Sequence, residues 1–248
     1  MKHEITRIRH DLRQRQLTVT GVEHITPGML RIRLAGADLA GFTSLAPDDH
    51  VKILIPGADG GLERRDYTPR QYDAAKGELA IDFALHEAGP ATAWALGARP
   101  GDGLTVAGPR GSQVVPADFD WWLLIGDETA LPAIGRRVEE LPAGVPVTSL
   151  VAVADAAEEQ RFATRADHRA LWVHRPLARA DDPAPLLSAL QELTLPPGEG
   201  FVWIAAEAGV ARALRRQVVE AMGHPPAWLR AAGYWVHGRA DAHEKFEN

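Results

Sequence analysis

Residues suited to holding a nucleotide cofactor cluster in the segment Arg65-Asp66-Tyr67-Thr68-Pro69-Arg70. Arginine can neutralise a phosphate by a forked contact, and tyrosine offers a flat ring and a hydroxyl. In a strand, Arg65 and Tyr67 point to one face and Thr68 to the other, unless irregular backbone before Pro69 turns it round. The set suits a flavin. The alternative is a surface strand with ordinary arginine and tyrosine.

A second segment, Asp82 to Ala95, combines a strand end with a helix start. We expect the strand to end near His86, Gly89 to make the turn and Pro90 to take the first helical position. Free backbone N–H groups at such a start form an anion site, which suits a pyrophosphate. The alternative is a plain strand–turn–helix connection with a satisfied His86. The candidate cofactor-binding residues of this half are Arg65, Tyr67, Thr68, Asp82, His86, Gly89, Pro90, Ala91, Thr92 and Trp94.

A third segment, Gly126-Asp127-Glu128-Thr129-Ala130-Leu131-Pro132-Ala133-Ile134, follows the apolar run Trp121–Ile125. A glycine after a parallel strand lets a dinucleotide approach the backbone, and Thr129 can cap the next helix. Acidic Asp127 and Glu128 beside a phosphate site are locally unfavourable, and capping alone does not explain them. Because no Gly-x-Gly-x-x-Gly occurs in the sequence, FAD is expected in the first half.

The last third adds Trp203–Glu207 and Gly233–Arg239. Glu207 can cap a following helix or contact a nicotinamide, whereas the bulk of Trp203 suits core packing. Either Tyr234 or Trp235 can stack on a flat ring. The candidate cofactor-binding residues of this half are Gly126, Asp127, Thr129, Ala130, Glu207, Tyr234 and Trp235.

The elements that carry these residues change character along the chain. The first half shows short β-rich runs between Gly, Pro and Asp clusters, which predict an antiparallel barrel. These runs are Leu17–Glu23, Met29–Leu34, His50–Ile55, Asp66–Tyr72, Glu78–Leu85 and Gly103–Val106. The second half alternates strands and helices, which predicts a parallel sheet covered by helices. Its expected strands are Trp121–Ile125, Val147–Val153, Leu171–His174 and Phe201–Ala205, with helices at Leu131–Leu141, Pro185–Leu193 and Gly209–Met222.

The predicted fold class is therefore a Greek-key β-barrel followed by an α/β domain. We expect residues 1–115 to bind FAD and residues 116–248 to bind NAD(P)H, with Gly111–Asp118 as the junction and a C-terminal tail at the end of the second domain. Ligands of such parallel sheets bind beyond the carboxyl ends of the strands.

Composition narrows the possible chemistry. The chain contains no cysteine, which excludes disulfides, iron–sulfur clusters and thiol catalysis. Its ten histidines are scattered, so no protein metal site is expected. The net charge of −6 argues against nucleic-acid binding, and no apolar run is long enough to span a bilayer. The basic arm before residue 16 is expected to be a partly mobile terminus, or alternatively to attract an anionic ligand. We expect a cytoplasmic protein and, by default, a monomer.

Together, the segments around Tyr67, His86 and Gly126 resemble the siderophore-interacting protein family of FAD-dependent ferric reductases, in the ferredoxin-reductase-like superfamily. The resemblance runs from about Leu17 to Arg239. It implies that electrons pass from NAD(P)H through FAD to the Fe(III) of a ferric siderophore, so that Fe(II) is released in the cytoplasm without a catalytic acid–base pair. It also implies that a terminal aromatic, Tyr234 or Trp235, covers the flavin until the nicotinamide displaces it.

The resemblance also implies a basic contact for the anionic chelate. Lys52 is the first candidate, followed by Arg110, His237 and Arg239. The family's usual arginine after the tryptophan is Val236 here, so His237 or Arg239 is the alternative. An ordinary strand lysine facing water is the other interpretation of Lys52.

Three questions stay open at this point. Another electron acceptor, such as ferredoxin or free flavin, is the alternative within the enzyme class, and a non-catalytic siderophore carrier is the alternative outside it. The donor is NADH, NADPH or a ferredoxin: Asp155 suits a ribose hydroxyl, whereas Arg161 and Arg165 suit a 2′-phosphate. The siderophore type is not encoded in any recognisable motif.

Overall fold

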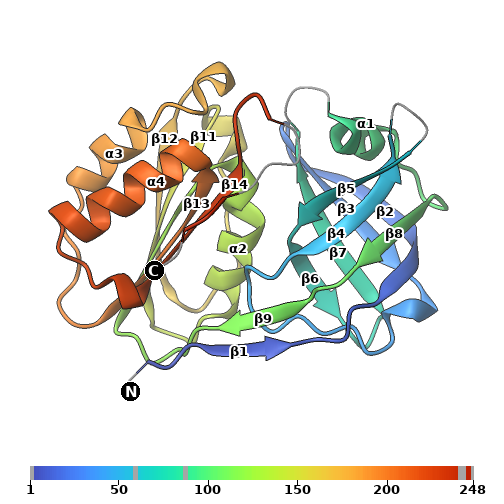
Figure 1. The fold of residues 1–248 in the computed structure, drawn as a ribbon, viewed down its shortest axis with the longest axis horizontal. Coiled ribbons are helices and arrows are strands. Elements are labelled where there is room, and N and C mark those ends of the chain that lie inside the picture. Colours follow the sequence, from blue (N-terminus) through green and yellow to red (C-terminus); the bar gives the residue numbers. More distant parts are fainter. Residues whose placement is uncertain (1–2, 58–60, 86–88, 240–243, 247–248) are drawn as a thin grey trace. The chain divides into compact units, whose positions relative to one another are not determined.

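A computed structural model of the chain describes residues 3–57, 61–85, 89–239 and 244–246 (Figure 1). Contacts within the chain divide it into two compact units. Unit 1 comprises Met1–Pro116 and Gly135–Arg137, and unit 2 comprises Ala117–Ile134 and Val138–Asn248. The sites below are built within each unit separately. His86, one of the candidate residues, lies outside the described residues.

Unit 1 is built on a seven-stranded sheet in which every neighbouring pair is antiparallel. The strand order is β5-β4-β8-β2-β3-β7-β6. The strands are β2 (Gln14–Thr26), β3 (Met29–Ala35), β4 (Val51–Pro56), β5 (Leu62–Tyr67), β6 (Pro69–Asp73), β7 (Glu78–Ala84) and β8 (Gly103–Ala107). In β2 to β4, buried apolar residues alternate with exposed or half-exposed ones, because one face of the sheet covers a core. The predicted antiparallel barrel is confirmed as a curled sheet.

The two edge strands of this sheet are consecutive in the chain. β5 ends at Tyr67 and β6 begins at Pro69, so Thr68 alone joins opposite edges of the sheet. The sheet must therefore curl until its edges meet at Thr68. The single strand expected at Asp66–Tyr72 was wrong, because the chain leaves one hydrogen-bonded ladder and enters another at this point, where Pro69 has no N–H to donate.

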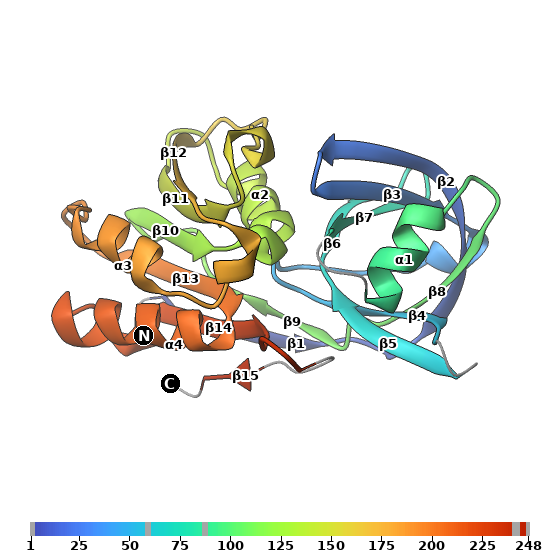
Figure 2. The same cartoon turned by 90° about the horizontal axis from the view of Figure 1, so that it is seen from above.

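Helix α1 (Pro90–Gly97) completes the core of unit 1. Its buried residues Ala91 and Ala95 pack in the same apolar cluster as the inward faces of the strands. Figure 2 shows α1 beside the curled sheet. A short 3-10 turn, η1 (Ala37–Leu39), adds Leu39 to the cluster.

A separate two-stranded sheet pairs β1 (Thr6–Arg9) with β9 (Gly111–Val114). Thr6–Arg9 are exposed, as expected for a solvated arm, but they form a strand rather than an irregular terminus. The expectation was wrong for Arg15, which is buried in β2 and donates to the carbonyl of Gly108 at 2.9 Å. Backbone pairing, which the charge pattern does not reveal, holds this segment in place.

Unit 2 contains the predicted parallel sheet, in the order β12-β11-β10-β13-β14-β15. Its strands are β10 (Trp121–Gly126), β11 (Pro146–Val153), β12 (Asp167–His174), β13 (Gly200–Glu207), β14 (Leu229–Trp235) and β15 (Glu244–Lys245), of which only β15 pairs antiparallel. The helices are α2 (Leu131–Glu140), α3 (Ala184–Gln191) and α4 (Ala208–Arg216). Figure 2 shows α2 on one face of the sheet and α3 and α4 on the other. Short turns occur at η2 (Glu128–Ala130), η3 (Ala156–Glu158), η4 (Leu177–Arg179), the π-helical η5 (Gln217–Ala221) and η6 (Pro226–Trp228).

The strand order of unit 2 reverses between β10 and β13. From β10 the chain moves outward to β11 and β12, and then returns to β13 on the other side of β10. This is a topological switch point, where the carboxyl ends of adjacent strands form a ligand-binding crevice. Those ends carry Gly126 and Glu207.

Strand β14 was not predicted as a strand. Its sequence, Leu-Arg-Ala-Ala-Gly-Tyr-Trp, has no β-branched residue, and its end was instead interpreted as part of a tail. Close packing explains the composition: a Cβ on Gly233 would lie 2.7 Å from Cβ of Ala208 in α4.

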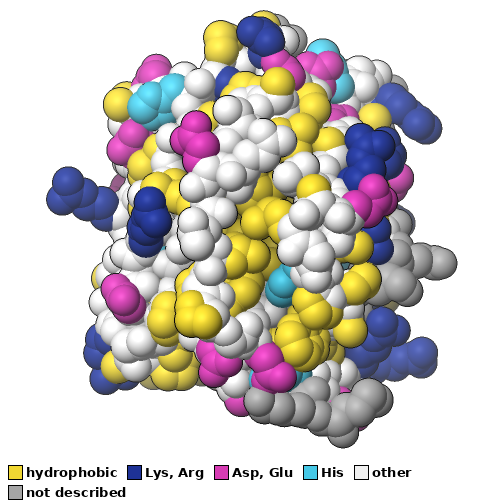
Figure 3. All heavy atoms as spheres, turned by 90° about the vertical axis from the view of Figure 1, so that its left-hand side faces the viewer, with side chains coloured by type: hydrophobic (Ala, Val, Ile, Leu, Met, Phe, Trp, Pro, Cys, Tyr) yellow, Lys and Arg dark blue, Asp and Glu magenta, His cyan; other side chains and the backbone are white. Residues whose placement is uncertain are grey.

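The face of unit 2 in Figure 3 shows hydrophobic side chains along its middle, while lysine and arginine side chains are scattered and form no single patch. Within the described part of the chain, no helix is both long and apolar enough to cross a bilayer. The same residues contain no cluster of three or more histidine, aspartate or glutamate side chains placed to hold a metal ion.

Candidate functional site

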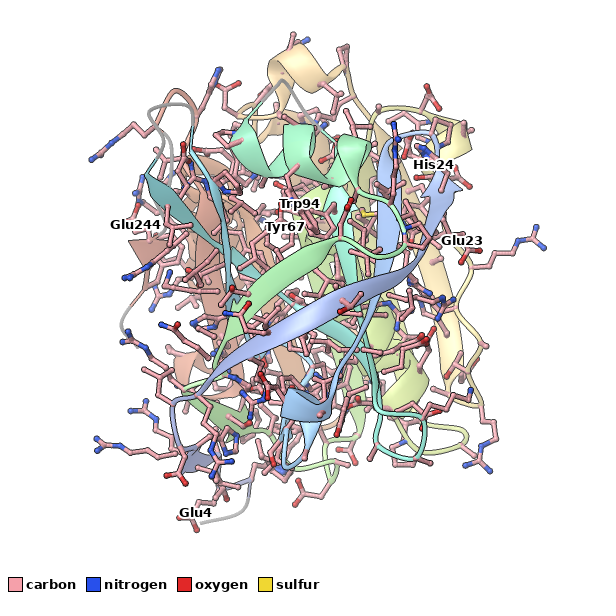
Figure 4. The ribbon with its side chains drawn as sticks, turned by 90° about the vertical axis from the view of Figure 1, so that its right-hand side faces the viewer. Glu4, Glu23, His24, Tyr67, Trp94 and Glu244 are labelled. Carbon is pink, nitrogen blue, oxygen red and sulfur yellow. The ribbon has the colours of Figure 1, made fainter. Side chains whose placement is uncertain are left out.

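An aromatic cluster in unit 1 brings together two of the predicted flavin-binding residues. The rings of Tyr67 and Phe83 have centroids 4.4 Å apart, and those of Phe83 and Trp94 are 5.9 Å apart. Figure 4 shows Tyr67 and Trp94 beneath the ribbon of α1, which carries Trp94. Burial raises the pKa of the Tyr67 hydroxyl, so it stays protonated and able to donate a hydrogen bond. This cluster supplies a flat, apolar support with one polar tip.

The start of α1 is open, as the sequence predicted. Gly89 is the N-cap residue, Pro90 takes the first position, and no side chain among the described residues caps the helix. A Cβ added to Gly89 would meet nothing within 4 Å. Thr92, in the first turn, is buried. An anion can therefore approach the helix start without displacing a protein cap.

Two charged candidates of unit 1 have protein partners. Arg65 forms an ion pair with Glu63 and donates to the carbonyl of Arg64. The buried carboxylate of Asp82 accepts two hydrogen bonds from Arg31, at 2.6 and 2.7 Å. Asp82 thus joins β7 to β3, while the Arg65 side chain remains partly exposed. Thr68 is buried at the meeting point of the sheet edges.

The candidate substrate contacts differ in how much of their charge is available. Lys52 forms a cross-strand ion pair with Asp66 at 2.9 Å, with about a third of each side chain exposed (32% and 29%). Arg110 is exposed on unit 1. In unit 2, Nδ1 of His237 lies 2.7 Å from Oδ2 of Asp181, and both side chains are exposed. Arg239 is exposed as well.

Asp127 occupies the switch point of unit 2 and is almost completely buried. Its Oδ1 accepts the backbone N–H of Thr129 at 2.9 Å and the Thr129 hydroxyl at 2.6 Å. Its Oδ2 accepts the backbone N–H of Glu207 and the indole N–H of Trp235, both at 2.9 Å. One carboxylate therefore joins the ends of β10, β13 and β14.

The structure assigns other roles than expected to two residues of this motif. Thr129 does not cap α2; Asp127 instead caps the short turn η2. At Gly126, a Cβ would lie 2.5 Å from Cβ of Ala130 and 2.6 Å from the Ala205 carbonyl. Glycine is thus required by packing between the strand and the following turn, whatever ligand binds nearby.

Glu207 caps α4, one of the two roles expected for it. Its Oε2 accepts the N–H groups of Gly209 at 2.5 Å and Val210 at 3.1 Å, and its Oε1 accepts that of His237 at 3.3 Å. Trp203 is buried, in agreement with a role in packing, and its ring meets that of Tyr234 edge-on, with centroids 6.0 Å apart. The two aromatic candidates therefore differ: Tyr234 packs on Trp203, and Trp235 binds Asp127.

Sequence reasoning missed Phe83, Arg175 and Asp181. Phe83 was inside the quoted second segment, and its position on the core face of β7 was the available signal. Arg175 directly follows β12, but its pairing with Glu128 depends on strand order, which one sequence does not reveal. Asp181 lies in a loop without a motif.

Comparison with known families finds two matches that together cover most of the chain. The siderophore-interacting protein profile matches residues 119–238. The siderophore-interacting FAD-binding domain profile matches residues 18–64 and 58–113. The two regions correspond to the cores of unit 2 and unit 1.

Whole-chain similarity leads to the same family. An Escherichia coli (strain K12) protein named NADPH-dependent ferric-chelate reductase is 40% identical over 92% of this chain and 95% of its own length. The structure titled "siderophore utilization protein from T. fusca" aligns with a TM-score of 0.90 and 38% identity over 96% of this chain and 98% of that one. The ferredoxin reductase in carbazole 1,9a-dioxygenase, at 17% identity, aligns with a TM-score of 0.65 over 88% of this chain and 68% of that one, which shows a common ferredoxin-reductase-like fold. The chain belongs to the siderophore-interacting protein family.

Proposed function

We propose that this protein is an FAD-dependent reductase of ferric siderophores that uses NAD(P)H as its reductant. The observation that carries the proposal is that each unit offers a nucleotide site. Unit 1 has an open helix start and an aromatic cluster, and unit 2 has a crevice at its switch point. The 40% identity to a protein named for NADPH-dependent ferric-chelate reduction supports the same activity. We assign FAD to residues 1–115 and NAD(P)H to residues 116–248.

The residues of unit 1 fit FAD. Tyr67 and Trp94 offer aromatic surface, the uncapped start of α1 offers N–H groups to a diphosphate, and Gly89 leaves the approach open. The partly exposed Arg65 can add a forked phosphate contact. When bound, FAD supplies the conversion of two-electron hydride chemistry to one-electron transfer, which the side chains of this protein do not perform.

The protein's own contribution is binding and electrostatics. In unit 2, Asp127 and Glu207 hold the carboxyl ends of β10, β13 and β14 in fixed positions, so the crevice is preformed for the dinucleotide. The iron arrives already wrapped in its chelator, so no protein ligand for the metal is needed. Lys52, Arg110, His237 and Arg239 are the proposed contacts for an anionic chelate, because an acidic protein needs local positive charge to attract one.

The test is to record the absorption spectrum of the purified, FAD-loaded protein under anaerobic conditions. NADH or NADPH should bleach the flavin bands, and a ferric siderophore should restore them while a ferrous indicator dye reports Fe(II). Reoxidation by ferredoxin or free flavin, with none by ferric siderophores, would favour the other acceptors. A purified protein that does not bind FAD would refute the proposal and favour a carrier.

The proposal extends to where and how the protein acts. We propose that the reduction takes place in the cytoplasm and that the protein functions as a monomer. Cell fractionation tests the first statement, and light scattering of the FAD-loaded protein tests the second. Recovery in a membrane or periplasmic fraction, or a stable dimer mass, would refute the corresponding statement.

A further inference from the structure

The indole of Trp235 reaches across a neighbouring strand. Trp235 ends β14, and its N–H binds Asp127, which follows β10, yet β13 lies between these two strands in the sheet. Trp235 is also paired in register with Glu207 at the end of β13. The side chain must therefore lie over the end of β13, at the switch point where a dinucleotide is expected.

Asp127 holds the indole firmly. Its buried carboxylate accepts four hydrogen bonds, two at each oxygen, and bonds to an ionised acceptor are stronger than neutral ones. Rotation of the indole would remove one of the two donors to Oδ2 and leave a buried charge less well compensated. The orientation of Trp235 is thus coupled to the strand ends.

The neighbouring aromatic is not equivalent. The register between β13 and β14 shifts here, since Gly233 pairs with Ala206 and Trp235 with Glu207, and the shift passes over Tyr234. Tyr234 packs edge-on against the buried Trp203, which commits it to the packing of unit 2. Trp235 is only partly buried, and its ring contacts that of the exposed His237, with centroids 6.3 Å apart.

We propose that Asp127 is a positioning residue that holds Trp235 as a fixed aromatic wall against which the nicotinamide ring of NAD(P)H packs. This inference rests on the proposed function for the identity of the ligand. It differs from the expectation of a terminal aromatic that swings away when the nicotinamide arrives. A fixed wall is preorganised, so binding does not have to order it.

Nuclear magnetic resonance of the ¹⁵N-labelled indole groups tests the wall directly. The W235F variant of the FAD-loaded protein identifies the Trp235 signal by its loss. We expect this N–H to be protected from exchange with solvent, to stay protected when NADP⁺ is added, and to shift with NADP⁺ but not with 2′,5′-ADP, which lacks the nicotinamide. Rapid exchange, loss of protection with NADP⁺, or equal shifts with both ligands would overturn the proposal.

A double-mutant cycle tests the role of Asp127. We expect D127N and W235F each to raise the Kd for NADP⁺ by about tenfold, and the double variant to bind no more weakly than either single one, because both changes remove the same contact. Additive losses would refute a role that acts through Trp235. Two matched controls are D120N, which changes an acceptor at the opposite end of β10, and W228F, a tryptophan in η6 just before the start of β14; neither should change the Kd.

The measurements separate this inference from the proposed function. If D127N does not fold, W235F and the exchange protection of the wild-type indole still decide the case. Exchange protection and NADP⁺ binding do not require iron reduction. A protected indole that shifts with NADP⁺, in a protein that fails to reduce ferric siderophores, would support the wall and refute the function. An active reductase whose Trp235 signal does not shift with NADP⁺ would support the function and refute the wall.

Discussion

Arg175 donates two hydrogen bonds to Glu128, at 2.7 and 2.6 Å, and joins the end of β12 to the turn that follows β10. Only 4% of the Arg175 side chain and 17% of the Glu128 side chain are exposed. The pair explains the acidic residue that seemed unfavourable in the Gly126 motif. Glu128 is the partner of a buried arginine, and the pair spans β11, which lies between β10 and β12 in the sheet.

Replacing Arg175 should destabilise the protein, because the buried Glu128 carboxylate would lose its ion-pair partner. We expect R175M to lower the free energy of unfolding by about 3 kcal/mol, because breaking a buried pair leaves a charge without compensation. Urea denaturation followed by circular dichroism measures this. The double variant R175M/E128M should recover most of the loss, and a double variant less stable than R175M would contradict the explanation.

The same variant should respond to pH. Burial raises the pKa of Glu128, and Arg175 opposes this rise. Without Arg175 the pKa rises further, so the carboxyl becomes neutral at a higher pH and the uncompensated charge disappears on acidification. The difference in stability between R175M and wild type should therefore be smaller at pH 5 than at pH 8. An equal difference at both values would be evidence against a charge effect.

Substitution by alanine should affect two glycines differently: stability should fall at Gly126, whereas FAD binding should weaken at Gly89. G126A should lower the free energy of unfolding by about 1–3 kcal/mol, because its Cβ would lie 2.5 Å from Cβ of Ala130. G89A should leave stability nearly unchanged, since its Cβ meets nothing within 4 Å, but weaken FAD binding by narrowing the start of α1. Thermal unfolding of the FAD-free protein and fluorescence titration with FAD measure the two effects. FAD binding as tight as wild type in G89A would argue against the diphosphate site.

Because Asp66 partly neutralises Lys52, removal of the Asp66 carboxylate should strengthen the binding of an anionic substrate. D66N should lower the KM for an anionic ferric siderophore about two- to threefold, and K52M should raise it, because the pair lies 2.9 Å apart and partly neutralises Lys52. Both effects should shrink at high salt. K76M, which changes an exposed lysine paired with Asp73, serves as the control. Identical KM values in D66N, K52M and K76M would exclude Lys52 from the substrate site.

Two histidines should make unit 2 sensitive to acid. Burial lowers the pKa values of His168 and His224. Because both pKa values lie below that of an unfolded histidine, about 6.5, the unfolded state binds more protons and stability falls as the pH drops below that value. The urea midpoint should fall less between pH 7.5 and 5 in H168Q and H224Q than in wild type. An unchanged slope in H168Q and H224Q would refute the prediction.

The fold could be predicted from sequence because its signals are local. Alternation in β2 to β4 and the continuous apolar run of β10 each follow from which faces are buried. Strand β14 was not predicted, because its glycine and alanines are suited to close packing against α4 and do not form a strand pattern. The break at Thr68 escaped because it depends on the two sheet edges meeting, which is a long-range property.

The candidate site divides in the same way. The open helix start at Gly89 and the cap formed by Glu207 could be predicted, since both depend on residues close in sequence. The bonds from Asp127 to Trp235 and from Glu128 to Arg175 join residues far apart in the chain. A single sequence shows that these residues are polar or aromatic, but their partners follow only from strand order.

The crossing at Thr68 places Arg65 and Tyr67 on one sheet edge and Arg70 on the other. A ligand that contacts this stretch touches the point at which the two edges of the curled sheet meet. Binding of the cofactor is then thermodynamically linked to the folding of unit 1, so the binding free energy of FAD would be added to the stability of that unit. The resistance of unit 1 to proteolysis would then report, in a cell, how much of the protein carries its cofactor.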